Sequence, residues 1–261
     1  MKHTEKDIEK LASALNRFSG RLNKEFLWRE QKAAYKSLAL LTSSDFVAEL
    51  NKEKNNWRRN VKLRHKLSEY WGGLVKAGRI NDAFAITRWL VKEWGGIKRI
   101  RDDTINQHFW DAINQKYSLP FDKISSKSKV FALANPDALQ IYDARVAVSL
   151  NSIQLAANTD VRIYFTIPET RIKSIQFNDD CFQARLPQGA FEEFDFVSIT
   201  LDSIYSAYIE LVNRLALRMS VSPVDVEMRL FGLAFDFCEN PKTLSDILSE
   251  ERRRRRANAI K

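Results

Sequence analysis

Glycine and proline are scarce in this sequence, with 8 glycines and 6 prolines among 261 residues. Because both residues interrupt regular elements, their scarcity favours long helices joined by few tight turns. Cysteine is scarcer still, since Cys181 and Cys238 are far apart and no CxxC or Cys/His cluster accompanies them. This pattern predicts neither a zinc site nor a disulfide framework. We therefore expect a mainly α protein that needs no metal and no other cofactor.

Long apolar runs are missing as well. No window approaches the roughly 18 uninterrupted apolar residues of a membrane-spanning helix. The segment Met1–Asp7 also lacks the apolar core of a signal peptide. We expect a soluble, cytoplasmic protein with no membrane partner. Walker-type loops, dinucleotide fingerprints and nucleophile elbows do not occur in the sequence, so those enzyme classes are not indicated.

Positive charge is in excess, because 42 Lys and Arg residues against 33 Asp and Glu give a net charge of +9. The excess gathers in residues 54–66 and in Arg252–Arg256. A basic surface attracts polyanions, so double-stranded DNA is the first partner to expect, with a merely solvated surface as the alternative. Arg58, Lys62 and Lys66 recur every four residues and predict one stripe on a helix that contacts phosphates.

Helical periodicity runs through residues 8–71. Gly20 and Trp71-Gly72-Gly73 are expected helix ends, because glycine readily adopts the left-handed conformation found at helix C-termini. A further amphipathic helix is predicted over Ile80–Trp94, closed by Gly95-Gly96. The repeated Trp-Gly-Gly fits a duplicated hairpin or a chance pairing of two helix ends.

Three regions are expected along the chain: an N-terminal helical region, a second helical domain and a basic tail, spanning residues 1–78, 79–245 and 246–261. In the second region, alternating apolar residues predict a small β or extended insertion around residues 160–186. Helices are predicted over Thr200–Met219 and Pro223–Cys238. Ser222 is the expected N-cap of the last helix, since Pro223 suits a first helical position.

The segment Ser125–Leu150 places charged residues at the edges of apolar runs. Lys129 precedes Val130–Leu133, and Asp143 precedes a second apolar run. Desolvation beside a hydrophobic wall shifts pKa values and makes a lysine nucleophilic. A salt-bridged helix cap gives the same sequence pattern, so both interpretations stand.

This segment also resembles a known family. The order Ser128-Lys129, an apolar helix, Asn135-Pro136 and Ile141-Tyr142-Asp143-x-Arg145-Val146 is similar to the catalytic segment of helix-hairpin-helix DNA glycosylases. The most similar members are bacterial proteins with an 8-oxoguanine DNA glycosylase fold. The resemblance is specific over residues 125–150 and looser over 80–235, where it extends to Trp94-Gly95-Gly96 and to Val226-Glu227-Met228-Arg229-Leu230-Phe231.

The resemblance implies a glycosylase-like helical domain that excises a damaged or modified base from DNA, in repair or in defence against foreign DNA. Asp143 would be the essential aspartate. Lys129 would be the lysine that attacks the sugar, with Lys127 as the alternative. The competing function is a non-catalytic nucleic-acid-binding subunit of a bacterial defence or repair complex, which adds other protein subunits to the expected partners.

Residues around the two catalytic candidates are expected to contact DNA. Hydroxyl and amide groups of Ser126, Lys127 and Ser128 would meet a phosphate at a helix N-terminus, although serines there also serve as plain caps. Arg145 would position Asp143 or touch DNA. The place of Asp143 separates the two functions: a buried site favours the enzyme, whereas a cap on the outer surface favours the binding subunit.

Overall fold

The computed structural model describes residues 2–25, 31–117, 119–169 and 194–239, together with residues 246, 249 and 253. Helices dominate these residues, so the mainly α fold class is confirmed. The first half contains α1 (Glu5–Glu25), α2 (Gln31–Leu41), α3 (Ser44–Asn51), α4 (Asn56–Lys76), α5 (Ile80–Trp89), a π-helical turn (Leu90–Trp94) and α6 (Asp102–Ile113). The second half contains a 3-10 turn (Phe121–Lys123), α7 (Ile124–Ala134), α8 (Ala144–Ala157), β1 (Arg162–Tyr164), β2 (Phe196–Ser198), α11 (Leu201–Met219) and α12 (Pro223–Glu239).

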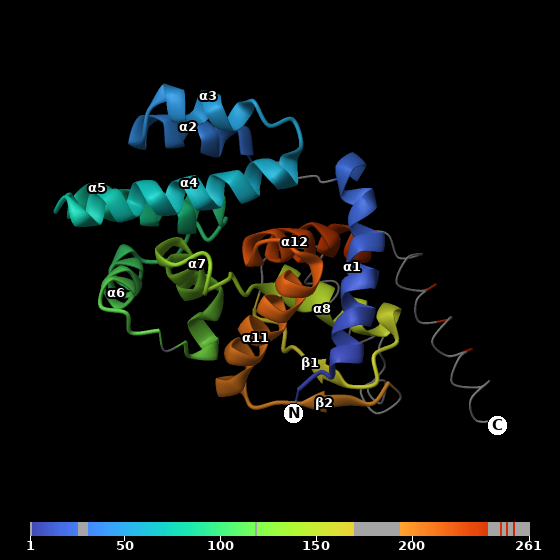
Figure 1. The fold of residues 1–261 in the computed structure, drawn as a ribbon. Helices are drawn as coiled ribbons and strands as arrows, with labels where there is room; N and C mark the ends of the chain where they lie inside the picture. The colour runs from blue at the N-terminus through green and yellow to red at the C-terminus, as the bar shows by residue number, and fades with distance from the viewer. Residues whose placement is uncertain are drawn as a thin grey trace.

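Helix α8 lies at the centre of the packed helices. Its residues from Ala144 to Leu155 are buried except Arg145, which is partly exposed. A helix that is buried on nearly all sides must be covered by other elements of the fold. Helices α1 and α12 pack directly on α8, and α11 packs on both of them. Figure 1 shows α12 between α8 and α4, with α2 and α3 outermost.

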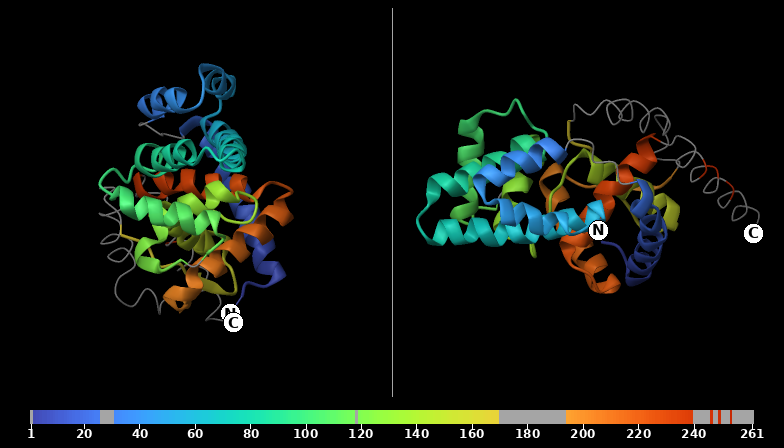
Figure 2. Two further views of the ribbon diagram at one scale, coloured as in Figure 1. Left: turned by 90° about the vertical axis from the view of Figure 1, so that its left-hand side faces the viewer. Right: turned by 90° about the horizontal axis from the view of Figure 1, so that it is seen from above.

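Most buried apolar side chains of the described residues form one hydrophobic core from Ile8 in α1 to Phe237 in α12, and a smaller cluster joins the π-helical turn, α6 and α7. Figure 2 shows the same arrangement from two further sides. Helices α2 to α5 lie together there, apart from α1. The predicted boundary between residues 78 and 79 falls between α4 and α5, which pack on each other. The three-region division therefore stays a prediction, and most of the tail lies outside the described residues.

Two amide side chains of α8 bind the backbone that follows it. Asn151 accepts a hydrogen bond from the Phe165 N–H and donates one to the Phe165 carbonyl oxygen, both at 2.9 Å. Gln154 does the same for Ile163, at 2.7 and 2.8 Å. The amides thus pair with β1 and with the residue directly after it, as a neighbouring strand does, so the buried N–H and C=O groups of Ile163 and Phe165 are satisfied.

The predicted insertion around 160–186 is described only in its first part. There β1 pairs in parallel with β2, and Arg162 lies opposite Phe196. The part from residue 170 to 186 lies outside the described residues. The helices predicted after it are confirmed as α11 and α12, and Ser222 Oγ accepts the predicted capping hydrogen bond from the Asp225 N–H at 3.1 Å.

Two predicted helix ends are wrong. Helix α1 continues through Gly20 to Glu25, and α4 continues through Gly72 and Gly73 to Lys76. Helix α4 ends at Lys76, two residues before the next glycine, Gly78, whose φ of +71° is the left-handed conformation. The end predicted at Gly95-Gly96 is confirmed, but the helix reaches it through a π-helical turn.

None of the helices in the described part of the chain combines the length and the apolar character that crossing a membrane requires.

Replacing Gly73 by alanine should stabilise the protein by about 0.5 to 1 kcal/mol, because glycine inside a helix costs backbone entropy. Gly73 is exposed in α4, and an added Cβ meets nothing within 4 Å. Urea unfolding measures the change as a higher midpoint with an unchanged slope. A lower midpoint would show that α4 needs this glycine for a reason other than helix formation.

Candidate functional site

Asp143 lies where an extended segment enters helix α8. Its backbone is extended, with φ of −135° and ψ of 178°. The Oδ1 atom of Asp143 accepts hydrogen bonds from the N–H groups of Arg145 and Val146, at 3.0 and 3.2 Å. Asp143 is therefore the N-cap of α8, where a carboxylate interacts favourably with the positive end of the helix dipole. It is buried and does not lie on the outer surface.

Lys129 of α7 lies beside this carboxylate. Its Nζ atom donates a hydrogen bond to the Ser125 carbonyl oxygen at 2.8 Å and lies 3.8 Å from Oδ2 of Asp143. Only 3% of the Lys129 side chain and 12% of the Asp143 side chain are exposed. Burial lowers the pKa of Lys129, and the Asp143 carboxylate acts against this shift. The two predicted catalytic residues are thus together, in an ion pair that also forms part of a helix cap.

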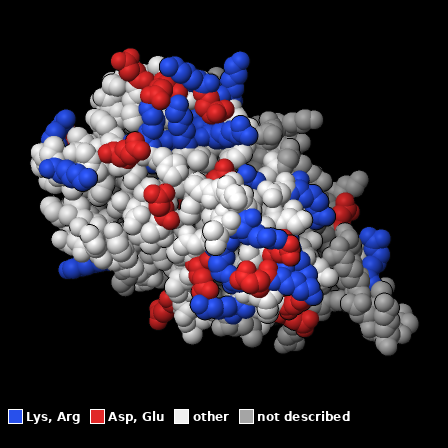
Figure 3. Space-filling view, in the orientation of Figure 1, with Lys and Arg blue, Asp and Glu red and all other residues white. Residues whose placement is uncertain are grey.

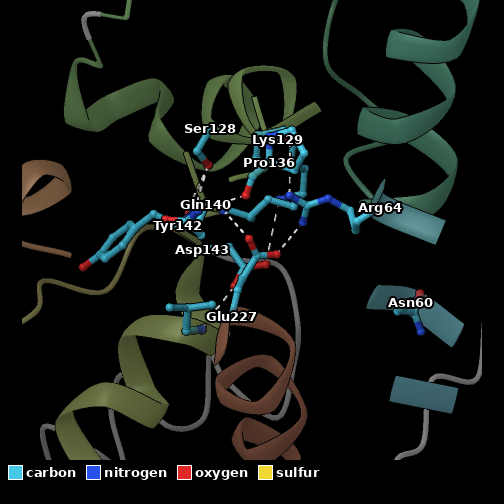
Figure 4. Close-up of polar contacts among 12 residues, drawn as sticks. Asn60, Arg64, Ser128, Lys129, Pro136, Gln140, Tyr142, Asp143 and Glu227 are labelled. Atoms are coloured by element: carbon cyan, nitrogen blue, oxygen red, sulfur yellow. Dashed lines mark hydrogen bonds and ion pairs between the residues drawn. The ribbon is translucent and has the colours of Figure 1, made fainter. Parts of the chain in front are cut away.

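Side chains from three helices hold the backbone that precedes Asp143 (Figure 4). The Ser128 hydroxyl accepts a hydrogen bond from the Tyr142 N–H at 3.1 Å and donates one to the Tyr142 carbonyl oxygen at 3.3 Å. Glu227 Oε2 accepts from the Ile141 N–H at 2.8 Å, and the Tyr208 hydroxyl donates to the Ile141 carbonyl oxygen at 2.8 Å. Every polar backbone group of these two residues is therefore bound by a buried side chain, which fixes the direction in which the chain reaches Asp143.

The second carboxylate oxygen of Glu227 forms an ion pair with Arg64 of α4. Nη1 of Arg64 lies 2.5 Å from Oε1 of Glu227, and both side chains are fully buried. Nη2 of Arg64 donates a longer hydrogen bond, 3.4 Å, to the Ala132 carbonyl oxygen at the end of α7. Burial raises the pKa of Glu227, whereas Arg64 and the Ile141 N–H favour its charged form. Arg64 and Glu227 together connect α4, α7 and α12 behind Asp143.

The residues expected at a phosphate-binding helix N-terminus point inward. Helix α7 begins at Ile124, so the serines lie within its first turns and not in a turn before it. Ser126 Oγ donates to the Lys123 carbonyl oxygen at 3.1 Å and lies 3.1 Å from His108 Nε2. Ser128 is fully buried against Tyr142.

Lys127 and Arg145 also face protein groups. Lys127 forms an ion pair with Asp111 of α6 at 2.7 Å, and 11% of its side chain is exposed. The guanidinium of Arg145 stacks 4.4 Å from the ring centre of Phe231. This contact places the Arg145 guanidinium against a core aromatic ring.

Glu49 of α3 neutralises part of the basic stripe on α4, which consists of Arg58, Lys62 and Lys66. Arg58 is exposed and lies over the Trp57 ring. Lys62 and Lys66 instead both form ion pairs with Glu49 of α3. Figure 3 shows the consequence, because the Lys and Arg atoms over α3 and α4 are interleaved with Asp and Glu atoms. The stripe exists, but its net charge is lower than three cations alone would give.

Arg64 and Glu227 were not expected at the site. Arg64 belongs to a basic run whose other charges are exposed or partly exposed, so composition alone marks it as a surface residue. Its helical position is more informative, since it lies four residues after Asn60 and three before Leu67, both buried. Glu227 likewise stands between Val226 and Met228, which indicates a buried position for a charged residue.

No protein-family model matches the sequence, no curated protein matches it, and no solved structure matches its fold. Among the described residues, His, Cys, Asp and Glu do not form any group of three that could hold a metal ion.

Arg64→Met should lower the free energy of unfolding by about 3 to 5 kcal/mol near neutral pH, because it leaves Glu227 buried without its cation. The loss should shrink in acid. Burial raises the folded-state pKa of Glu227 and Arg64 opposes this shift, so the variant has a still higher pKa and loses stability as pH rises from the ordinary glutamate range through that pKa. Urea unfolding over a pH series measures this dependence.

The matched control is the double variant Arg64→Met with Glu227→Gln, which removes both charges. It should regain much of the stability at neutral pH and lose the pH dependence. An Arg64→Met variant whose stability does not change between acidic and neutral pH would contradict a Glu227 pKa that burial raises in the folded protein.

Proposed function

We propose that this chain is a DNA glycosylase-like enzyme that releases a damaged or modified base from double-stranded DNA, with Asp143 as its catalytic residue. The observation that carries the proposal is the fixed carboxylate of Asp143. Its Oδ1 atom is bound by two N–H groups at the start of α8, and its Oδ2 atom faces Lys129. The resemblance over residues 125–150 supplies the reaction class.

A fixed carboxylate suits this reaction. As the bond between C1′ and the base nitrogen breaks, the electron pair leaves with the base and positive charge develops on the sugar. A carboxylate already held in place stabilises that charge without reorganising. The oxygen of a water molecule then bonds to C1′ and releases one proton, while the departing base takes up another. The products are a free base and an abasic sugar in an intact strand.

The site must also receive a base that has left the duplex. Extruding a nucleotide costs a few kcal/mol and costs least for a damaged or mispaired base, which favours such substrates. The basic residues of α4 support the same partner, because neutralising phosphates supplies sequence-independent affinity. A single-turnover assay on a panel of duplexes that carry different modified bases tests the proposal. Binding of these duplexes without release of any base would instead favour the non-catalytic binding subunit.

Asp143→Asn should abolish base release and leave DNA affinity nearly unchanged. Asparagine keeps the volume and is an equally good N-cap, so the start of α8 is preserved while the negative charge is lost. Single-turnover rates and binding titrations on one confirmed substrate measure the two effects separately. Asp7→Asn is the matched control, because Asp7 is a second buried aspartate in the first turn of a helix. Equal rates of base release for Asp143→Asn and the wild type would contradict the catalytic role of Asp143.

Glu49→Gln should strengthen binding to every duplex, because it frees Lys62 and Lys66 for phosphates. The slope of log affinity against log salt should steepen by up to about 0.9 for each added phosphate contact. Arg58→Gln should flatten the same slope by a similar amount. Titrations at several salt concentrations decide the matter: unchanged slopes in both variants would mean that this face of α4 does not meet DNA.

A further inference from the structure

The two Trp-Gly-Gly sequences have different surroundings. At Gly72 and Gly73, inside α4, an added Cβ would meet nothing within 4 Å. At Gly95, an added Cβ would lie 2.7 Å from Cε and 2.8 Å from Cδ of Lys129, and 2.9 Å from the Leu90 carbonyl oxygen. Real Cβ atoms do not approach other carbon atoms so closely, so an alanine at residue 95 would displace the Lys129 side chain.

The π-helical turn brings Gly95 to this place. The Gly95 N–H donates to the Leu90 carbonyl oxygen at 2.8 Å, five residues back along the chain. This turn packs against α7, the helix that carries Lys129. The φ of Gly95 is −80°, which any residue adopts. The requirement for glycine therefore comes from the missing side chain and not from the backbone conformation. Turns of this kind are frequent at functional sites.

Lys129 is consequently held along its whole length. The backbone at Gly95 confines its outer carbons, the Ser125 carbonyl oxygen accepts a hydrogen bond from its Nζ atom, and Asp143 lies at the end of the side chain. An amine that attacks C1′ of a sugar would have to leave all three contacts. The water-mediated reaction requires no such movement.

We infer that Gly95 is a positioning residue that locks Lys129 as the fixed charge partner of Asp143, so that the protein releases a base with water as nucleophile and does not cut the strand. The reaction part of this inference rests on the proposed function. The locking of Lys129 by Gly95 does not depend on it.

Unfolding measurements on a set of variants test the lock. Gly95→Ala should lower the urea midpoint in the wild-type background. It should lower the midpoint equally with Lys129→Met, whose side chain still fills the space, and less with Lys129→Ala, which empties that space and leaves only the contact with the Leu90 carbonyl oxygen. Gly73→Ala is the matched control and should raise the midpoint in all backgrounds. The same loss for Gly95→Ala in all three backgrounds would overturn the lock.

Borohydride reduction during turnover tests the reaction part, on a duplex from which the wild type releases the base. No covalent complex between protein and DNA should form. Gly95→Ala should slow single-turnover release by up to about a hundredfold with DNA affinity unchanged, because small displacements at a reacting centre have effects of that size. Gly73→Ala should leave both unchanged.

The outcomes separate the two proposals. A trapped complex that is lost in Lys129→Ala, or in Lys127→Ala, would overturn the inference and leave the proposed glycosylase function standing. If the wild type releases no base from any duplex, the proposed function fails, and the unfolding measurements still decide whether Gly95 locks Lys129.

Discussion

The buried ion pair between Arg64 and Glu227 is the interaction on which the candidate site depends. Two fully buried charges are costly unless each is paired and its remaining polar atoms are bound. Glu227 meets this condition by accepting from both Arg64 and the Ile141 N–H. The same carboxylate therefore ties α4 to α12 and fixes the segment that leads to Asp143. A hydrophobic pair of equal volume would fill the space, but it would not bind a backbone N–H group.

The polar groups around this pair form a chain of dependent contacts. Ser128 holds Tyr142, Tyr142 precedes Asp143, and Asp143 caps α8. Helix α8 in turn holds β1 through its two amide side chains. Because these groups bind one another, a change at one residue leaves another buried and unpaired, which costs more than the lost bond alone. The position of Asp143 is thus set by residues from several helices and not only by its own cap.

Sequence patterns predicted helix starts, which depend on neighbouring residues, and missed contacts between residues that are far apart in the sequence. Ser222 and Asp143 are found at helix starts because capping depends on residues within a single turn. The ends predicted at Gly20 and Gly72 failed because a glycine marks a helix end only where the chain turns away, and packing decides that. The pairing of Arg64 with Glu227 joins residues 163 positions apart. Periodicity indicates that each is buried, but it cannot identify its partner.

The meaning of a short motif likewise depends on what packs against it. Trp71-Gly72-Gly73 and Trp94-Gly95-Gly96 share their letters, yet the first lies within a regular helix and the second closes a π-helical turn over Lys129. Both tryptophans are buried and each donates a hydrogen bond from its ring N–H, to Thr87 and Asn60 respectively. The tryptophans thus have the same structural role in both copies, as core residues with one satisfied polar atom. The glycines differ, because only the second copy faces a helix with a long side chain that needs the space of a missing Cβ.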